Sequence, residues 1–294
     1  MSTPKPQSRT PIGMLLPCLL AFGIFTLIPL VGSLILSFCR SQGSGGVCFV
    51  GLANFRFILT DVAFWGSLAN TTLFAIGFVL LQTPLALGLA AGLHSRHLRL
   101  RSAVRFALFT PYFVGPVYAS VLFGAMLDTR YGLLNRMLGV QVNWLNDPRL
   151  AMASMLLVGL WMSVGFASLY IAAAMQGINP ELYAAAQVDG AGSLRRLWHI
   201  TLPSIRPTLT LLVLIGVIQA YQLFELPYVL FGGPGPSSAG LTVVMYLYGV
   251  GFEAGDFGYA SAVGWMLVLF LSLLMLLAYL PFRKTLAQQQ HAAA

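Results

Sequence analysis

The sequence predicts an all-α, polytopic membrane protein with six transmembrane helices. Of its 294 residues, 58% are hydrophobic and only 8% are charged, whereas about a quarter of the residues in soluble domains are charged. Six apolar runs are each long enough to cross a bilayer, which takes about 20 residues in a helix. Because the runs are hydrophobic on all sides, they suit helices that satisfy their own backbone groups in lipid.

The six predicted spans cover most of the chain. The first contains Pro17 and Pro29 and is far longer than the apolar core of a signal peptide, so we expect a retained helix. No soluble domain, repeat array or low-complexity tract interrupts the pattern. The spans are expected at residues 12–38, 64–93, 104–127, 150–175, 208–231 and 257–280.

The basic residues predict the orientation. With the N-terminus in the cytoplasm, eleven Lys and Arg fall in cytoplasmic segments and five fall outside. Cytoplasmic loops carry the excess of such residues, so both termini are expected inside the cell. The predicted organisation is a cytoplasmic tail at 1–11, a first helix with its outer loop at 12–63, a transmembrane core at 64–281 that includes a cytoplasmic loop at 176–207, and a cytoplasmic tail at 282–294.

The net charge of +8 does not indicate a nucleic-acid partner. The positive-inside rule explains it, and no basic patch alternates with exposed aromatic residues. Cys39 and Cys48 fall in one predicted outer loop, where a disulfide and two free thiols are both open readings. His94 and His97 have no neighbouring metal ligand, so neither a metal site nor a bound cofactor is expected.

The chain carries no recognisable catalytic motif. A phosphate-binding P-loop needs a lysine directly after a glycine, and neither Lys5 nor Lys284 follows one. H-E-x-x-H and G-x-S-x-G motifs are also missing from the sequence. We therefore expect a protein that is not an enzyme, and ATP hydrolysis, if the function needs it, must come from a separate subunit.

A polar, Ala-rich segment separates the fourth and fifth predicted spans. Asn179 suits a helix N-cap, Pro180 the first helical position, and Glu181 the positive end of the helix dipole. Gly190 ends this helix, because glycine accepts a left-handed backbone. A second short helix, LRRLWHI, is expected to end before Pro203. Local physics leaves two readings open, a docking surface for a partner and a packed connector on the membrane.

The stretch NPELYAAAQVDGAGSLRRLWHITLPSIRP resembles the EAA loop of ABC-transporter permeases. That pattern is E-A-A, two residues, D-G-A, then F-x-x-I-x-L-P; here alanine replaces its glutamate and leucine its phenylalanine. In that family the loop docks into a cytoplasmic ATPase subunit. The resemblance implies that coupling involves Glu181, Tyr183, Ala184, Ala185, Ala186, Asp189, Gly190, Ala191, Leu197, Ile200, Leu202 and Pro203.

Other stretches, among them FELPYVLFGGPGPSSAGLTVVMYLY and FGYASAVGW, resemble the MalF-like half of the carbohydrate-uptake permeases. The resemblance implies the type I ABC importer fold, in its compact six-helix form, in the bacterial inner membrane. It also implies a second, MalG-like permease, two copies of an ATP-binding subunit and an extracytoplasmic solute-binding protein as partners, besides membrane lipid. An oligosaccharide, a monosaccharide and a glycerol phosphate all remain open as the substrate.

One polar stripe interrupts the fifth predicted span. Glu225 is essentially the only carboxylate away from the ends of the spans. Gln222 and Tyr221 precede it by three and four residues, which is helical spacing, and Gln219 extends the polar stripe. A charge in lipid is costly, so we interpret the stripe as lining a translocation path. The alternatives are a structural hydrogen bond to the partner permease and a position near the outer interface.

Asn70 and Trp161 are weaker candidates for the same path, as are Thr71, Thr72 and Ser163. Such Asn and Thr side chains more often join helices, and Trp more often anchors a helix end. Three rival functions remain: an ion-driven carrier, a membrane-embedded enzyme and a membrane scaffold. The first lacks the expected buried charges, and the second lacks a catalytic cluster.

Overall fold

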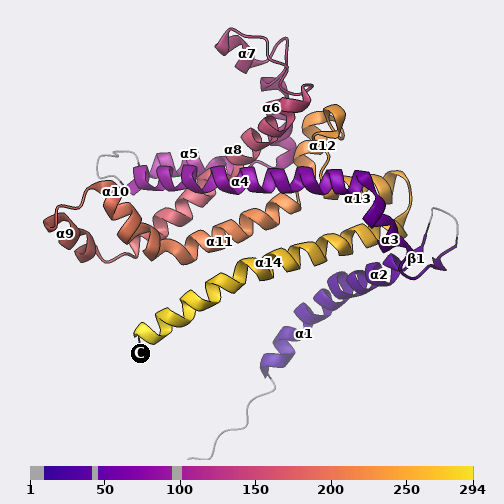
Figure 1. Ribbon diagram of the computed structural model, residues 1–294, viewed down its shortest axis with the longest axis horizontal. Helices are drawn as coiled ribbons and strands as arrows, with labels where there is room; N and C mark the ends of the chain where they lie inside the picture. Colours follow the sequence, from indigo (N-terminus) through magenta and orange to yellow (C-terminus); the bar gives the residue numbers. More distant parts are fainter. Residues whose placement is uncertain (1–9, 42–45, 95–100, 294) are drawn as a thin grey trace, which may run out of the picture. The chain divides into compact units, whose positions relative to one another are not determined.

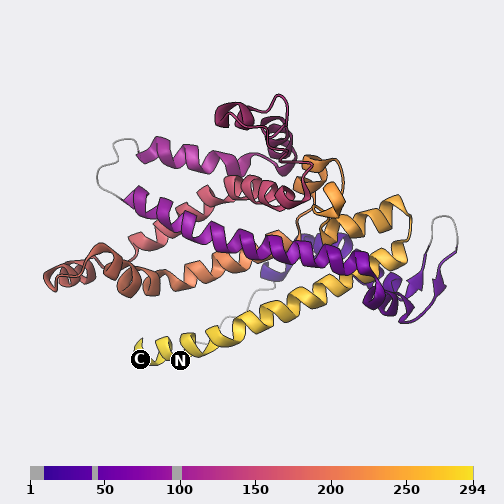
Figure 2. The same ribbon diagram turned by 45° about the horizontal axis from the view of Figure 1, so that its top comes forward.

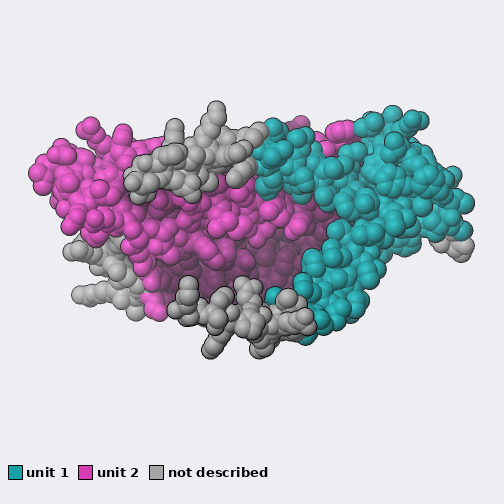
Figure 3. Space-filling model, turned by 90° about the horizontal axis from the view of Figure 1, so that it is seen from below, with its two compact units in different colours: residues 1–61, 247–294 teal, residues 62–246 magenta. Residues whose placement is uncertain are grey.

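The computed structural model describes residues 10–41, 46–94 and 101–293, and most of them are helical (Figure 1). Residues 1–9 of the predicted tail at 1–11, the tip of the first outer loop and most of the basic loop after His94 lie outside the described residues. The chain forms two compact units, coloured separately in Figure 3. Unit 1 joins residues 1–61 to residues 247–294, and unit 2 consists of residues 62–246.

Unit 2 is built on three long helices that lie side by side, α4 (Val62–His94), α8 (Pro148–Gln176) and α11 (Leu202–Tyr221), with α5 (Arg101–Phe113) against α8 (Figures 1 and 2). The first two confirm the second and fourth predicted spans. Small residues let the helices approach closely, as is usual in membranes. A side chain at Gly165 of α8 would collide with the carbonyl oxygen of Leu108 on α5.

The third predicted span is broken. Helix α5 ends at Phe113, and α6 (Pro116–Met126) leaves it at an angle of 100°. Gly115 takes an extended backbone with φ −59° and ψ 151°, because the residue before a proline is disfavoured in the helical region. The prediction of one helix over 104–127 is therefore wrong, and the pair is one bent span or a re-entrant segment.

The helix that contains the fifth predicted span begins earlier than expected, at Ser193 instead of residue 208. α10 (Ser193–Arg196), a π-helical turn at Leu197–Thr201 and α11 follow one another without a break. The second short helix therefore does not end before Pro203, and that prediction is wrong. The amide of Leu202 bonds to the carbonyl of Leu197, so the wide turn comes directly before the proline, which has no N–H to donate.

The same span is interrupted near its end. α11 ends at Tyr221, and α12 (Glu225–Phe231) begins after a three-residue break. The predicted continuous helix over 208–231 is therefore wrong in its last third. The remaining short elements of unit 2 are α7 (Leu133–Leu138), α9 (Pro180–Val188) and a 3₁₀ turn at Pro236–Ser238. Helix α13 (Val243–Tyr248) includes the point, after Tyr246, at which unit 2 ends. In Figures 1 and 2, α9 lies at the opposite end of unit 2 from α7 and α12.

Unit 1 pairs the first and last helices of the chain. α1 (Thr10–Phe22), a π turn at Gly23–Leu27 and α2 (Ile28–Ser37) form the first predicted span. α2 packs against α14 (Phe257–Ala293), which contains the sixth and follows a second π turn at Gly249–Glu253. The described residues hold five helices long and apolar enough to cross a bilayer, or six if the bent pair counts as one span.

The outer loop of unit 1 holds a short hairpin, β1 (Cys39–Arg40) and β2 (Cys48–Phe49), followed by α3 (Ala53–Thr60). Cys39 lies opposite Phe49 in the register, so Cys39 and Cys48 point to opposite faces and both thiols are free. The side-chain amide of Asn54 donates to the carbonyls of Ser37 and Cys39, at 2.9 Å each. This contact joins α3 to the end of α2.

Candidate functional site

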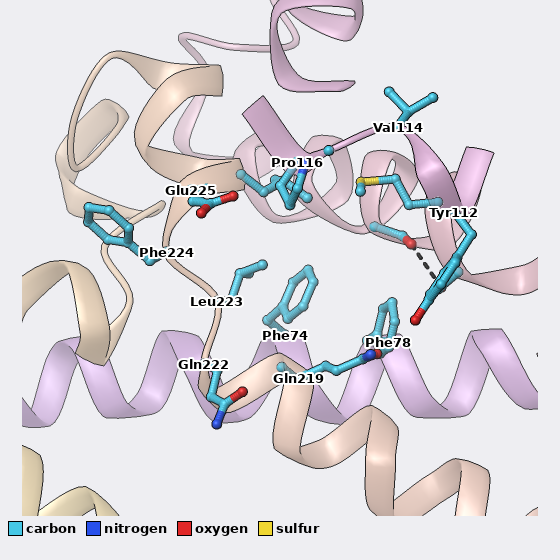
Figure 4. Close-up of a pocket in the computed structure, with 16 residues that line it drawn as sticks. Phe74, Phe78, Tyr112, Val114, Pro116, Gln219, Gln222, Leu223, Phe224 and Glu225 are labelled. Carbon is cyan, nitrogen blue, oxygen red and sulfur yellow. Dashed lines mark hydrogen bonds between the residues drawn. The ribbon is translucent and has the colours of Figure 1, made fainter. Parts of the chain in front are cut away.

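A cavity of about 440 Å³ lies within unit 2 (Figure 4). Its volume falls within the usual range of small-molecule sites. Residues from α4, α5 and α8 surround it, together with both helix breaks described above. The lining residues are Phe74, Phe78, Tyr112, Val114, Gly115, Pro116, Gly159, Met162, Ser163, Gln219, Ala220, Gln222, Leu223, Phe224, Glu225 and Leu226.

Three residues of the predicted polar stripe line this cavity together: Gln219, Gln222 and Glu225. They do not share one helix face, as the spacing predicted, because α11 ends before Gln222 and Glu225 opens α12. The break in the chain brings them to the cavity instead. The Glu225 side chain is exposed and is not buried between helices. No other described lining residue is charged.

Aromatic rings form much of the remaining wall. The rings of Phe74 and Phe78 stack with centroids 5.6 Å apart and an angle of 18°. In the view of Figure 4 they lie between Glu225 and Tyr112. Amide, carboxylate and hydroxyl groups beside aromatic faces make a site that can hydrogen-bond a polar ligand and also cover its apolar face.

Tyr221 lies elsewhere, although the sequence placed it in the polar stripe. Its ring is buried, and its hydroxyl shares a 2.9 Å hydrogen bond with the hydroxyl of Thr72. Either oxygen can be the donor. This contact joins α11 to α4, and Tyr221 is not among the lining residues of the cavity.

Asn70, Thr71 and Trp161 also make helix and loop contacts outside the cavity lining. The Asn70 amide donates to the carbonyls of Ser238 at 2.9 Å and Leu241 at 3.2 Å, and the Thr71 hydroxyl accepts from the amide of Val243. The Trp161 ring meets the ring of Phe123 edge to face at 5.3 Å. Of the weaker candidates, only Ser163 lines the cavity.

Sequence reasoning missed the aromatic lining and the bend between α5 and α6. Val114, Gly115 and Pro116 line the cavity at that bend. A Gly-Pro pair in the middle of an apolar run was the available signal, because irregular backbone at membrane depth is tolerated only within protein or beside a polar cavity. Phe74 and Phe78 gave no signal, since they look like any apolar residues in a span.

The second predicted site, the Ala-rich loop, folds largely as expected. The Asn179 side chain accepts a hydrogen bond from the amide of Glu181 at 3.0 Å, and Pro180 opens α9. Gly190 takes the left-handed conformation with φ +73°. Both predictions are confirmed. The Asn179 cap begins α9, and the left-handed Gly190 reverses the chain between α9 and α10.

Two contacts fix α9 to the rest of unit 2. The hydroxyl of Tyr183 shares a 2.9 Å hydrogen bond with the hydroxyl of Thr201 in the π turn. Tyr183 and Ile200 also pack against a buried apolar cluster that includes Ile171 of α8 and Ile205 of α11. These contacts connect α9 and the π turn to both long helices.

The outer side of this loop is open and apolar. Val188 is 89% exposed, and Leu194 and Trp198 are also exposed. The other predicted coupling residues divide by position: Glu181, Ala184, Ala185, Asp189, Gly190 and Pro203 are exposed, whereas Ala186, Ala191, Leu197, Ile200 and Leu202 are half-buried.

Residues 82–284 match the family described as binding-protein-dependent transport system inner membrane component. The chain belongs to this family. The permease is 33% identical over 267 residues to the arabinooligosaccharides transport system permease protein AraP of Bacillus subtilis, covering 89% of this chain and 85% of that protein. It is 32% identical to the trehalose/maltose permease protein MalF of Thermococcus litoralis, with 85% of each chain covered.

Solved structures agree with the sequence relatives. The permease resembles a chain in the crystal structure of a bacterial ABC transporter that imports the acidic polysaccharide alginate, with a TM-score of 0.82, 26% identity and coverage of 93% and 94%. The MetNI methionine transporter shares the fold alone, with a TM-score of 0.53 and 15% identity. The predicted ABC permease family and importer fold are thus confirmed, and the permease is a multi-pass membrane protein.

Proposed function

We propose that this permease forms half of the translocation path of an ATP-driven importer for a carbohydrate. The observation that carries the proposal is the cavity of unit 2, whose lining combines Gln219, Gln222 and Glu225 with aromatic residues (Figure 4). Sugars present many hydroxyl groups and apolar C–H faces, and such a wall can meet both. Relatives named for arabinooligosaccharides, trehalose and maltose, and lactose support this substrate class.

The charge of the cavity favours a neutral sugar. Glu225 is the only charged side chain among the described lining residues, and a carboxylate in a confined site repels another anion. Two amide side chains can donate and accept hydrogen bonds without a charge requirement. A glycerol phosphate or an acidic sugar therefore fits this cavity less well than a neutral oligosaccharide or monosaccharide.

The loop at 176–207 is the proposed coupling loop. The exposed face of α9, α10 and the π turn after them suits a cleft in a separate ATP-binding subunit, because small alanines of α9 allow close approach and Trp198 of the π turn offers an anchor. Support for transmission comes from the Tyr183 hydroxyl contact to the π turn at the start of α11. α11 ends at the cavity, so motion of α9 can change the cavity.

The proposed assembly contains this permease, a second and similar permease, two copies of the ATP-binding subunit and an external solute-binding protein. A related transporter has been crystallised with its substrate-bound periplasmic protein, which supports the last partner. In the proposed arrangement both termini and the coupling loop face the cytoplasm. The proposed organisation keeps cytoplasmic tails at 1–11 and 282–294, a first helix with its outer loop at 12–63 and a transmembrane core at 64–281.

Reconstitution tests the proposed function. The complete importer in proteoliposomes is expected to take up radiolabelled maltose, lactose or arabinotriose only when ATP and the binding protein are both present. Vanadate is expected to block uptake, because the motor is an ATPase. Uptake that persists with vanadate and follows an ion gradient would instead favour a secondary carrier.

A further inference from the structure

The break between α11 and α12 contains a carbonyl group that a continuous helix would leave without a donor. In an α-helix the carbonyl of Leu223 would accept from the amide four residues later, but that residue is Pro227, which has no N–H to donate. The backbone of Phe224 also lies outside the helical region, with φ −135° and ψ −62°. At membrane depth such a carbonyl needs a donor from elsewhere in the protein.

Thr242 supplies this donor. Its hydroxyl donates to the Leu223 carbonyl, with 2.6 Å between the two oxygens, although the residues are 19 positions apart in the chain. The same hydroxyl accepts from the amide of Met245 at 3.3 Å, as an N-cap of α13 does. Thr242 is only 1% exposed. Both bonds are therefore shielded from water, where an unsatisfied polar group is most costly.

Ser120 of α6 holds the chain on the other side of the break. Its hydroxyl lies 3.0 Å from the carbonyl of Leu226 and 2.7 Å from the carbonyl of Pro116, one turn earlier in its own helix. A hydroxyl has one proton to donate, so the two carbonyls share it. Ser120 is also only 1% exposed. Two buried hydroxyls from different elements therefore bind the backbone within two residues of Glu225, one before it and one after it.

The segment held by these two bonds carries the polar wall of the cavity. Glu225 lies between the two bonded carbonyls and Gln222 lies directly before the first, and both side chains line the cavity (Figure 4). Thr242 and Ser120 are not among the lining residues. A break has no helical ladder of its own to fix the directions of its side chains, and ligand-binding side chains are held in place by a second layer of hydrogen bonds. The two hydroxyls provide that layer here.

We propose that Thr242 and Ser120 are positioning residues for substrate contact, because they hold the broken chain so that Gln222 and Glu225 stay in the cavity wall. This inference rests on the proposed function, in which the cavity is part of the sugar path. A binding site that is correctly formed for only part of the time binds with an affinity reduced by that fraction. Neither hydroxyl needs to touch the sugar to change how tightly the cavity holds it.

Substitutions that remove only a hydroxyl test the proposal. Thr242→Val keeps the branched shape of the side chain, and Ser120→Ala removes a single oxygen atom. Thr210→Val is the matched control, because the Thr210 hydroxyl donates to the carbonyl of Arg206 within α11 itself. Initial uptake of maltose, lactose or arabinotriose is measured in proteoliposomes with the binding protein, beside ATP hydrolysis and the amount of assembled importer. Hydrogen exchange over residues 222–228 reports on the break without any sugar.

Thr242→Val and Ser120→Ala are each expected to lower uptake by about 2- to 12-fold, the fold-change that corresponds to one hydrogen bond. Assembly and ATP hydrolysis are expected to change little, and exchange over 222–228 is expected to become faster. Thr242→Ser keeps the hydroxyl and is expected to retain uptake, and Thr210→Val is expected to behave as wild type. In a Glu225→Ala background, Thr242→Val is expected to lower uptake by a smaller factor, because one of the side chains that it positions is already removed.

Wild-type uptake in both Thr242→Val and Ser120→Ala would overturn the proposal, as would exchange over 222–228 that neither substitution changes. Effects of Thr242→Val and Glu225→Ala that multiply in full would also overturn it, because independent effects mean that Thr242 does not act through the cavity wall. If Thr242→Val does not assemble, Ser120→Ala decides by the same measurements. A wild-type importer that takes up none of the three sugars, while exchange over 222–228 is faster in the hydroxyl variants, would count against the proposed function alone.

Discussion

Glu225 is a lone carboxylate in a cavity whose other polar groups are amides and hydroxyls. Its position follows from the break at the end of α11, which turns the chain before α12 begins. A hydrogen bond between a sugar hydroxyl and a charged acceptor is worth about 1.5–3 kcal/mol. This residue is therefore the side chain in the cavity whose replacement is expected to weaken substrate contact most.

We expect Glu225→Ala to lower the initial rate of sugar uptake by about tenfold or more, since about 1.4 kcal/mol corresponds to a factor of ten. Assembly is expected to stay intact, because the side chain is exposed. Glu253→Ala is the control, as Glu253 is an exposed carboxylate in unit 1. Transport kinetics that do not change in Glu225→Ala would remove Glu225 from the path.

Gly190 takes a left-handed backbone conformation in the turn between α9 and α10. Its φ of +73° costs an L-residue roughly 1–2 kcal/mol, while an added Cβ meets no atom within 4 Å. Gly190→Val is expected to change the turn between α9 and α10, and hence to reduce uptake and binding-protein-stimulated ATP hydrolysis several-fold. Gly192→Val is the control, because Gly192 has an ordinary φ of −67° and equally open surroundings. Equal behaviour of the two variants would contradict a role of the left-handed turn.

At the scale of elements, α5 packs closely on α8, and both helices line the cavity. The two helices touch where Gly165 meets the carbonyl of Leu108. Close packing of small residues replaces the hydrophobic effect as the main attraction between helices in lipid. The packing of two helices that line the cavity therefore depends on a glycine that is not among the lining residues.

Gly165→Ala is expected to force α5 away from α8 and to lower stability by roughly 1–3 kcal/mol, the usual cost of overpacking. Thermal unfolding of the purified importer in detergent measures the loss. Gly88→Ala on α4 is the control, since a Cβ there meets nothing within 4 Å and alanine favours a helix by about 1 kcal/mol over glycine. An unfolding temperature unchanged in Gly165→Ala would mean that the two helices can separate freely.

The loop between α6 and α7 responds to pH through Asp128. Its carboxylate accepts hydrogen bonds from the amides of Tyr131 at 2.7 Å and Arg130 at 2.9 Å. These bonds hold the pKa of Asp128 below its ordinary value of 3.8. The bonds are therefore fully present above the unfolded-state pKa and are lost as the pH falls through the lower folded-state value.

In the wild-type protein, faster exchange of the Tyr131 amide is thus expected only at strongly acidic pH. In the Asp128→Asn variant, faster exchange of the same amide is expected already at neutral pH. Hydrogen exchange measured by mass spectrometry on the importer checks both. Amides further along the loop, around the buried Asn135, serve as the internal control, because neutral side-chain hydrogen bonds hold that part of the loop. Tyr131 exchange that is the same in Asp128→Asn as in wild type at neutral pH would contradict the effect.

At the scale of the whole molecule, the coupling loop and α12 lie at opposite ends of α11 (Figures 1 and 2). An importer needs these ends on opposite sides of the membrane. The excess of basic residues predicts that the coupling loop faces the cytoplasm. The orientation is therefore a direct test of the proposed mechanism.

Single cysteines test the orientation. In a variant with Cys18, Cys39 and Cys48 replaced by serine, Asp189→Cys is expected to react with a membrane-impermeant maleimide only after the cells are opened. Thr129→Cys, beside α7, is the matched control and is expected to react in intact cells. Labelling of Asp189→Cys in intact cells would contradict coupling to a cytoplasmic ATPase.

The sequence by itself determined the membrane class and the helix–turn–helix of the loop at 176–207. Those features depend on local chemistry: apolar length, the Asn179 cap, Pro180 and the left-handed Gly190. The EAA-type pattern also predicted the family correctly, because the residues that carry it are contiguous in the chain.

Only the tertiary structure decided which residues share the cavity. The polar stripe was predicted from helical spacing, yet α11 ends at Tyr221, so Tyr221 turns to Thr72 while Gln222 and Glu225 reach the cavity. The aromatic contacts of Tyr112 and Phe166 join helices far apart in sequence. Apolar residues within a span all look alike to a pattern, because lipid and protein neighbours both accept them, and only packing shows which of them face a ligand.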